Sequence, residues 1–141
     1  EGKVQQLPVK QHRTKTTSRY FNYIYVRMGA HTLIHKRTED DIWKNLFELP
    51  LVETEKDLSE EEFLACPQFH ALFAEGEVRM VRTLLRGVKH VLSHRVIYTN
   101  FYEVTLPDNS SSFSSYQRVA VEDLGRYAVP RLIHAFLEKY V

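Results

Sequence analysis

The segment 19–28, Arg-Tyr-Phe-Asn-Tyr-Ile-Tyr-Val-Arg-Met, constrains the fold more than any other part of the chain. Side chains alternate between the two faces of a strand, and in this segment both faces are apolar. One face carries Phe21, Tyr23 and Tyr25, and the other carries Tyr20, Ile24, Val26 and Met28. Because an apolar face must be covered, we expect this strand to lie in the middle of a sheet, with structure packed on both sides.

Further strands are expected over 31–37, 77–85, 95–106 and 116–121. The first of these follows a tight turn at Gly29-Ala30 and is expected to pair with the strand 19–28. The segment 77–85 has a helix as its alternative, and Arg86-Gly87 is expected to turn the chain after it. A short strand near Pro50 should bend or end there, because proline cannot donate to a central ladder.

Two helical regions are predicted, at 59–74 and from Pro130 onwards. In the first region Ser59 and Glu62 have the spacing of a capping box, and Pro67 divides the region into two helices. The second region has an apolar stripe that we expect to pack in the core, formed by Leu132, Ile133, Phe136, Leu137, Tyr140 and Val141. Strands, then helices, then strands and a terminal helix predict an α+β fold with a mixed sheet and helices on its faces.

Length and charge indicate one domain with a basic arm. The 141 residues suit a single core, and the aperiodic residues 1–18 are expected to be a linker that precedes a domain over 19–141. Residues 1–20 and 77–100 each carry five Lys or Arg against one Glu, whereas 39–62 carry ten Asp or Glu against two Lys. The basic blocks predict contact with a polyanion, with the acidic block facing away; a solvated mixed-charge surface is the alternative.

The sequence also bears on the cellular setting. No apolar run approaches the ~20 residues that span a bilayer, and no signal peptide is visible, so we expect an intracellular, cytoplasmic protein without a membrane partner. The single Cys66 can form neither an internal disulfide nor an iron–sulfur site by itself. Because the chain begins with Glu1 rather than Met, we expect it to be part of a longer protein.

The candidate functional site is the stretch around Ser93-His94. These two polar residues interrupt strand-like apolar sequence, which predicts a bend or loop whose tip faces outward, with Lys89 and Arg95 beside it. A hydroxyl and an imidazole at such a tip can bond to a base edge or a phosphate. The alternative is an ordinary connection with polar residues facing water. Neighbours on a strand point to opposite faces, so the pair is not a nucleophile with its base.

No catalytic or metal site is predicted. The consecutive carboxylates Glu60–Glu62 do not share one helix face. The pairs His31 with His35 and His90 with His94 lack a thiolate or carboxylate placed to complete a metal site. No glycine-rich phosphate loop occurs. The lone Trp43 is expected to be a packing anchor, with a stacking platform for a base as the alternative.

Several patches together resemble the C-terminal domain of the MutY family of A/G-specific adenine DNA glycosylases. In chain order they are Leu7-Pro8-Val9-Lys10, Arg19-Tyr20-Phe21, the run from Asp41 to Pro50, Leu92-Ser93-His94 and Ala128-Val129-Pro130. The run Leu-Phe-Glu-Leu-Pro resembles the family's L-W-E-F-P, with Phe47 where Trp is usual. Leu92-Ser93-His94 resembles the family's F-S-H loop, with Leu in place of Phe.

The resemblance implies a MutT-like, or Nudix, fold, with a mixed sheet between helices in an α/β/α sandwich. It also implies a role in base excision repair, in which this domain helps to recognise 8-oxoguanine paired with adenine in duplex DNA. Ser93 would read the oxidised guanine, His94 would lie close to the lesion, and Leu92 would be the wedge or packing residue.

The same resemblance implies that the catalytic machinery lies elsewhere. In the family, adenine is removed by an N-terminal helical domain that holds an iron–sulfur cluster. This chain has neither the length nor the cysteines for that domain. We therefore expect no catalytic residue and no cofactor here, and we expect two partners: duplex DNA and the N-terminal glycosylase domain, joined through 1–18.

Two alternative functions stay open. A Nudix pyrophosphohydrolase acting on oxidised nucleotides needs the pattern G-x5-E-x7-R-E-x2-E-E-x-G, and the region Glu60–Glu62 lacks its preceding Gly and its Arg-Glu pair. A protein-interaction module with the same fold is the other alternative, for which the loop Ser110–Ser115 could serve. The sequence leaves the oligomeric state open.

Overall fold

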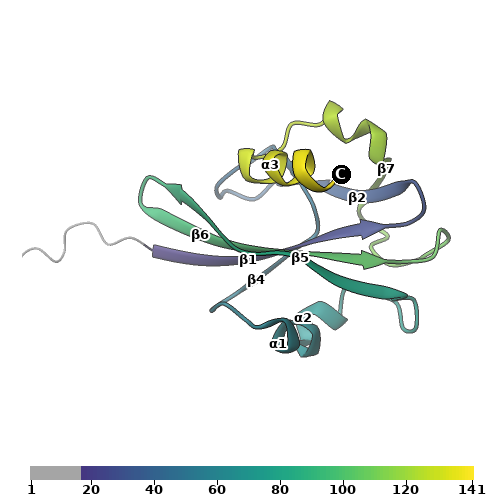
Figure 1. Ribbon diagram of the computed structural model, residues 1–141. Coiled ribbons are helices and arrows are strands. Elements are labelled where there is room, and N and C mark those ends of the chain that lie inside the picture. The colour runs from purple at the N-terminus through teal and green to yellow at the C-terminus, as the bar shows by residue number, and fades with distance from the viewer. Residues whose placement is uncertain (1–16) are drawn as a thin grey trace, which may run out of the picture.

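The computed structural model describes residues 17–141, and a four-stranded sheet runs through its middle (Figure 1). The strand order is β4-β1-β6-β5. The bounds are Thr17–Arg27 for β1, Leu51–Thr54 for β4, Met80–Leu92 for β5 and Arg95–Thr105 for β6. β1 pairs in parallel with β6, whereas β4 and β5 are antiparallel to their neighbours, so the sheet is mixed, as predicted. The predicted connector 1–18 lies outside the described residues, except for its last two residues, which begin β1.

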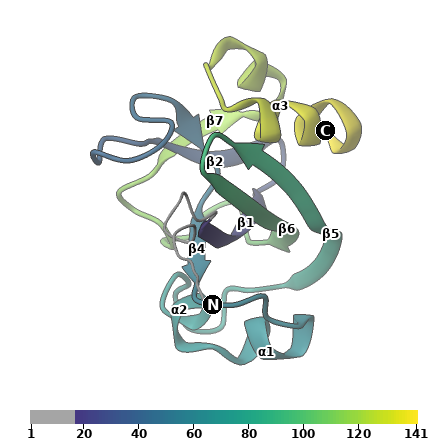
Figure 2. The same ribbon diagram turned by 90° about the vertical axis from the view of Figure 1, so that its left-hand side faces the viewer.

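Helices cover the two faces of this sheet (Figures 1 and 2). Helices α1 (Glu60–Ala65) and α2 (Pro67–His70) lie on one face, which we call the α1 face, and α3 (Arg131–Tyr140) lies on the other, the α3 face.

The central strand β1 is buried on both faces, as predicted. Its three aromatic residues Phe21, Tyr23 and Tyr25 belong to one core cluster, on the α3 face, together with Phe136. Ile24, Val26 and Met28 belong to a second cluster, on the α1 face, together with Phe63 and Phe69. Two cores divided by one strand account for the apolar pattern on both sides of the segment 19–28.

The predicted pairing of segment 31–37 with β1 is wrong. The second strand forms a separate three-stranded sheet, in the order β3-β2-β7. The bounds are His31–Lys36 for β2, Phe47–Glu48 for β3 and Gln117–Ala120 for β7. The turn at Gly29, where φ is 62°, leaves only one bridge, between Met28 and His31. β6 takes one edge of β1 along its whole length, and β4 takes the other edge over Tyr20–Tyr23. Beyond the single bridge β2 leaves β1 and pairs with β3 and β7.

The predicted turn at Arg86-Gly87 is also wrong. Strand β5 runs without a break from Met80 to Leu92, and its pairing with β6 shifts register on either side of Leu85. Gly87 has a φ of 70°, and its N–H donates to Oδ1 of Asn100 at 2.8 Å. The glycine therefore marks a bulge, where the chain changes register and continues in the same direction.

The helix signals are confirmed, although the helices are short. Ser59 Oγ accepts from the N–H of Glu62 at 3.1 Å, and Glu62 Oε1 accepts from the N–H of Ser59 at 2.9 Å, which closes the predicted capping box. Pro67 is the first residue of α2, and Pro130 is the N-cap of α3. The segment after β7 forms the 3₁₀ helix η2, Val121–Arg126. Among the described residues, no helix is long and apolar enough to cross a membrane.

A buried carboxylate ties the strands beside Pro50 to the core. Glu48 is 2% exposed, and its Oε1 accepts from the Tyr23 hydroxyl at 2.7 Å and from Arg37 Nη1 at 2.9 Å. Burial, together with the nearby Glu48 charge, raises the pKa of Tyr23 well above its usual value. The predicted short strand ends before Pro50, as β3, and a second short strand, β4, begins after it. The network thus fixes the run Leu-Phe-Glu-Leu-Pro against β1.

Removing this carboxylate should destabilise the domain strongly. We expect Glu48→Ala to lower the free energy of unfolding by about 3 kcal/mol, because a buried arginine and a buried hydroxyl lose their partner. Urea unfolding measures the change. The control is Glu138→Ala, an exposed carboxylate on α3, which should change stability by less than about 0.5 kcal/mol. Equal losses for the two variants would contradict the structural role of Glu48.

Candidate nucleic-acid interface

The stretch Ser93-His94 forms the turn of a long hairpin between β5 and β6. Leu92 lies opposite Arg95 at the last pair of the ladder, and both turn residues are exposed. The turn projects beyond α3 and α1 at one end of the molecule (Figure 1). The predicted exposed turn is therefore confirmed, and it presents a hydroxyl and an imidazole to solvent. β1 begins beside it, since the N–H of Thr17 donates to the His94 carbonyl at 3.1 Å.

The base of the hairpin is held firmly on the α3 face. Leu92 is half-buried against the core, and Ile97 is fully buried. The ring of His90 meets Trp43 edge-on at 5.9 Å between centroids, and Trp43 meets Phe21 in the same way at 6.1 Å. Trp43 is thus a packing anchor between the loop before β3 and the sheet, which agrees with the packing prediction.

An acidic residue lies beside the hairpin, contrary to the expectation that the acidic block faces away from it. Asp41 accepts two hydrogen bonds of 2.9 Å from Arg19, binds Arg37 at 3.1 Å and lies 3.9 Å from Arg95. Arg19 also binds Glu53 at 2.8 Å. The hydrogen bond from Arg19 is the main cause that lowers the pKa of Asp41 to about 2, so the carboxylate stays charged at neutral pH. The arginines on the α3 face therefore carry their own counter-charges.

The structure brings four of the five candidate residues together and separates the fifth. A shallow cavity of about 260 Å³ is lined by Ile42, Leu92, Ser93, His94 and Arg95. Its volume lies below the ~300 Å³ typical of the smallest ligand pockets, so it is too small to enclose a nucleotide. Lys89 is exposed on the opposite, α1 face of the hairpin. Sequence reasoning missed Ile42 as a lining residue, because no local pattern shows that its loop folds back to the hairpin.

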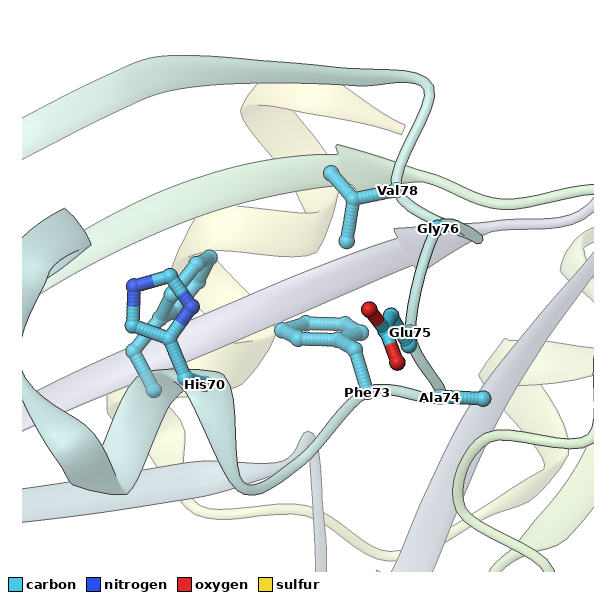
Figure 3. Close-up of a pocket in the computed structure, with 7 residues that line it drawn as sticks. His70, Phe73, Ala74, Glu75, Gly76 and Val78 are labelled. Atoms are coloured by element: carbon cyan, nitrogen blue, oxygen red, sulfur yellow. The ribbon is translucent and has the colours of Figure 1, made fainter.

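A second cavity, of about 440 Å³, lies between α2 and the segment that leads into β5 (Figure 3). Phe73 lies between His70 and Glu75 in this view, and Val78 faces it from the other side. The lining is mainly aromatic and aliphatic, and His70 and Glu75 are its only titratable groups. This cavity is separate from the hairpin and has no arrangement for acid–base chemistry.

Two of the three carboxylates of α1 are already hydrogen-bonded within the protein, so they do not fit the metal centre that a Nudix pyrophosphohydrolase would need. Glu62 closes the capping box, and Glu60 accepts from the Thr83 hydroxyl at 2.6 Å. Within residues 17–141, no three His, Cys, Asp or Glu side chains are grouped closely enough to hold a metal ion.

Comparison with known proteins identifies the family. A family model described as NUDIX domain matches residues 22–139. The C-terminal domain of mouse MUTYH, solved in complex with human PCNA, superposes with a TM-score of 0.65 at 15% identity over 86% of each chain. The MutT protein of Methanosarcina mazei Go1 superposes with a TM-score of 0.56 at 18% identity, over 88% of this chain and 93% of that one. The E. coli ORF135 protein gives 0.56 at 14% identity, over 93% and 91%.

No curated protein sequence matches the chain significantly. The structural likenesses, all at low identity, establish the fold, and they confirm the predicted MutT-like arrangement of a mixed sheet between helices. Because the family model spans nearly all of the described domain, the chain belongs to the NUDIX domain family.

Proposed function

We propose that this domain is the lesion-recognition domain of an adenine DNA glycosylase, which helps to recognise 8-oxoguanine paired with adenine in duplex DNA. The observation that carries the proposal is the exposed Ser93-His94 turn, held at the end of a long hairpin whose base is packed into the core. Excision of the adenine, and the iron–sulfur cluster, would belong to an N-terminal domain of the same protein. The fold shared with the C-terminal domain of mouse MUTYH supports this assignment.

The chemistry of the turn suits the lesion. Guanine presents a bare N7, which accepts hydrogen bonds, whereas 8-oxoguanine carries a hydrogen on N7 and an oxygen on C8. The Ser93 hydroxyl can accept from that N7–H, and the His94 imidazole lies one residue away to contact the lesion or a neighbouring phosphate. The rigid base of the hairpin matters here, because ordering a mobile turn on binding would cost conformational entropy and weaken each contact.

The other candidate residues have different roles in this proposal. Leu92 is half-buried against the core, which favours packing under the turn over wedging into the base stack. Arg95 is directed toward Asp41, so its charge is partly compensated. Lys89 has an exposed side chain and is the better placed of the two cations to meet a phosphate.

Losing the Ser93 hydroxyl should reduce lesion discrimination. In the full-length glycosylase, we expect Ser93→Ala to lower the preference for 8-oxoguanine over guanine opposite adenine by about 1–3 kcal/mol, the scale of one base-edge contact. Single-turnover rates of adenine excision on the two duplexes measure this preference. Ser115→Ala, an exposed serine in the loop before β7, is the matched control. An unchanged ratio of rates for Ser93→Ala would contradict the proposed role.

The domain should not hydrolyse nucleoside triphosphates, oxidised or not, in the presence of Mg²⁺. The reason is that Glu60 and Glu62 on α1 already serve structural hydrogen bonds, which a bound metal would have to break. Release of phosphate or pyrophosphate measures the reaction, with an active MutT hydrolase as positive control. Release above background would instead favour a Nudix pyrophosphohydrolase.

A further inference from the structure

The two faces of the sheet differ at the end where the hairpin turns. On the α1 face, one row of side chains crosses all four strands there, and the register places them side by side: Thr54, Tyr20, Tyr98 and Lys89. The helices of this face lie beneath the other half of the sheet and leave the hairpin half without a helix (Figures 1 and 2). Val91, in the neighbouring row, is 65% exposed, which is unusual for a β-branched apolar residue.

The two tyrosines of this row support each other. Their rings stack with centroids 5.6 Å apart and planes 16° apart, across the parallel pairing of β1 and β6. Both side chains are half-buried, and neither hydroxyl makes a hydrogen bond with another part of the chain that the structure describes. A stacked, immobilised pair of this kind holds two hydrogen-bond donors at fixed positions.

Charge distinguishes the two faces more sharply. On the α3 face, Arg19 and Arg95 share the carboxylates of Asp41 and Glu53. On the α1 face, Lys89 stands opposite Tyr98, and the row toward the turn holds Val91 and Val96. The row on the other side holds Asn100, which donates to Asp57, and that carboxylate lies 3.5 Å from Arg86. A polyanion approaching the hairpin therefore meets compensated charge on the α3 face and an ammonium with two phenol donors on the α1 face.

We propose that the row Lys89, Tyr98 and Tyr20 binds the phosphate backbone of duplex DNA, so that the DNA lies against the α1 face at the hairpin end. This inference rests on the proposed function, and it names the side of the domain that meets DNA. Lysine and tyrosine side chains commonly contact phosphate oxygens, and such contacts fix register while a base contact specifies sequence. The turn at Ser93, which lies beyond the neighbouring row of Val91, would then reach the base edge while the row holds the backbone.

The test measures binding of the whole chain to two fluorescent duplexes, one with an 8-oxoguanine:adenine pair and one undamaged, over a series of salt concentrations. We expect Lys89→Gln to weaken binding to both duplexes and to reduce the slope of log K against log salt by about 0.9, the value for one phosphate contact. Tyr20→Phe and Tyr98→Phe keep the stacked rings and remove only the hydroxyls. Each should weaken binding about threefold or more, with little change in slope. Lys139→Gln, an equal charge loss on α3, should leave both measurements unchanged.

The outcomes separate this inference from the proposed function. If Lys89→Gln leaves the slope unchanged, or if Arg95→Gln reduces it instead, the DNA does not lie on the α1 face and the inference is overturned. Another outcome is that the row variants behave as expected while Ser93→Ala does not alter the preference for the lesion. That result supports the phosphate contacts of the row and contradicts the proposed lesion-reading function. Absence of binding to either duplex at low salt overturns the inference, whereas the proposed function is judged by the excision rates of the full-length glycosylase.

Discussion

The parallel pairing of β1 with β6 is the interaction on which the rest of the structure depends. It joins residues far apart in the chain, from Thr17 opposite Arg95 to Arg27 opposite Thr105. Closing so long a loop costs conformational entropy, which local contacts cannot offset. Burial of both faces of these two strands offsets it, because their side chains fill two separate cores. β4 and β5 lie on the outer edges of this pair.

The same pairing creates the end of the molecule that carries the candidate site. β1 and β6 extend beyond the helices of the α1 face, so the last rows of the sheet are covered on the α3 face alone (Figure 1). There the loop that carries Trp43 packs under the hairpin and brings Asp41 with it. One element thus supplies both the rigidity of the turn and the counter-charge for the arginines. On the opposite face no helix covers these rows, and Lys89 and Val91 are exposed there.

Features set by adjacent residues were predictable from the sequence, and features set by distant residues were not. The two apolar faces of 19–28, the capping box at Ser59 and the turn at Ser93 are local patterns, and all three are found. The tight turn at Gly29 is a local signal that predicts a hairpin of β1 with β2, whereas the actual partners β4 and β6 come from distant segments. Gly87 was read as a turn since a glycine in a bulge and a glycine in a turn have the same local signature. No sequence pattern near Ser93 indicates that Asp41 and Ile42 are its neighbours, because they come from a distant segment of the chain.

The compensated arginines bear on how a lesion reader can be selective. Each phosphate contact adds affinity for any duplex, whereas one base-edge contact adds only about 1–3 kcal/mol for the right base. If the arginines at the hairpin end had no carboxylate partners, the domain would bind undamaged DNA strongly. The single contact at Ser93 would then contribute only a small part of the total affinity. In the proposed function, the ion pairs of Asp41 with Arg19, Arg37 and Arg95 would limit the non-specific attraction to DNA on one face. The proposed function therefore favours few phosphate contacts, placed where they orient the turn, over a broad basic surface.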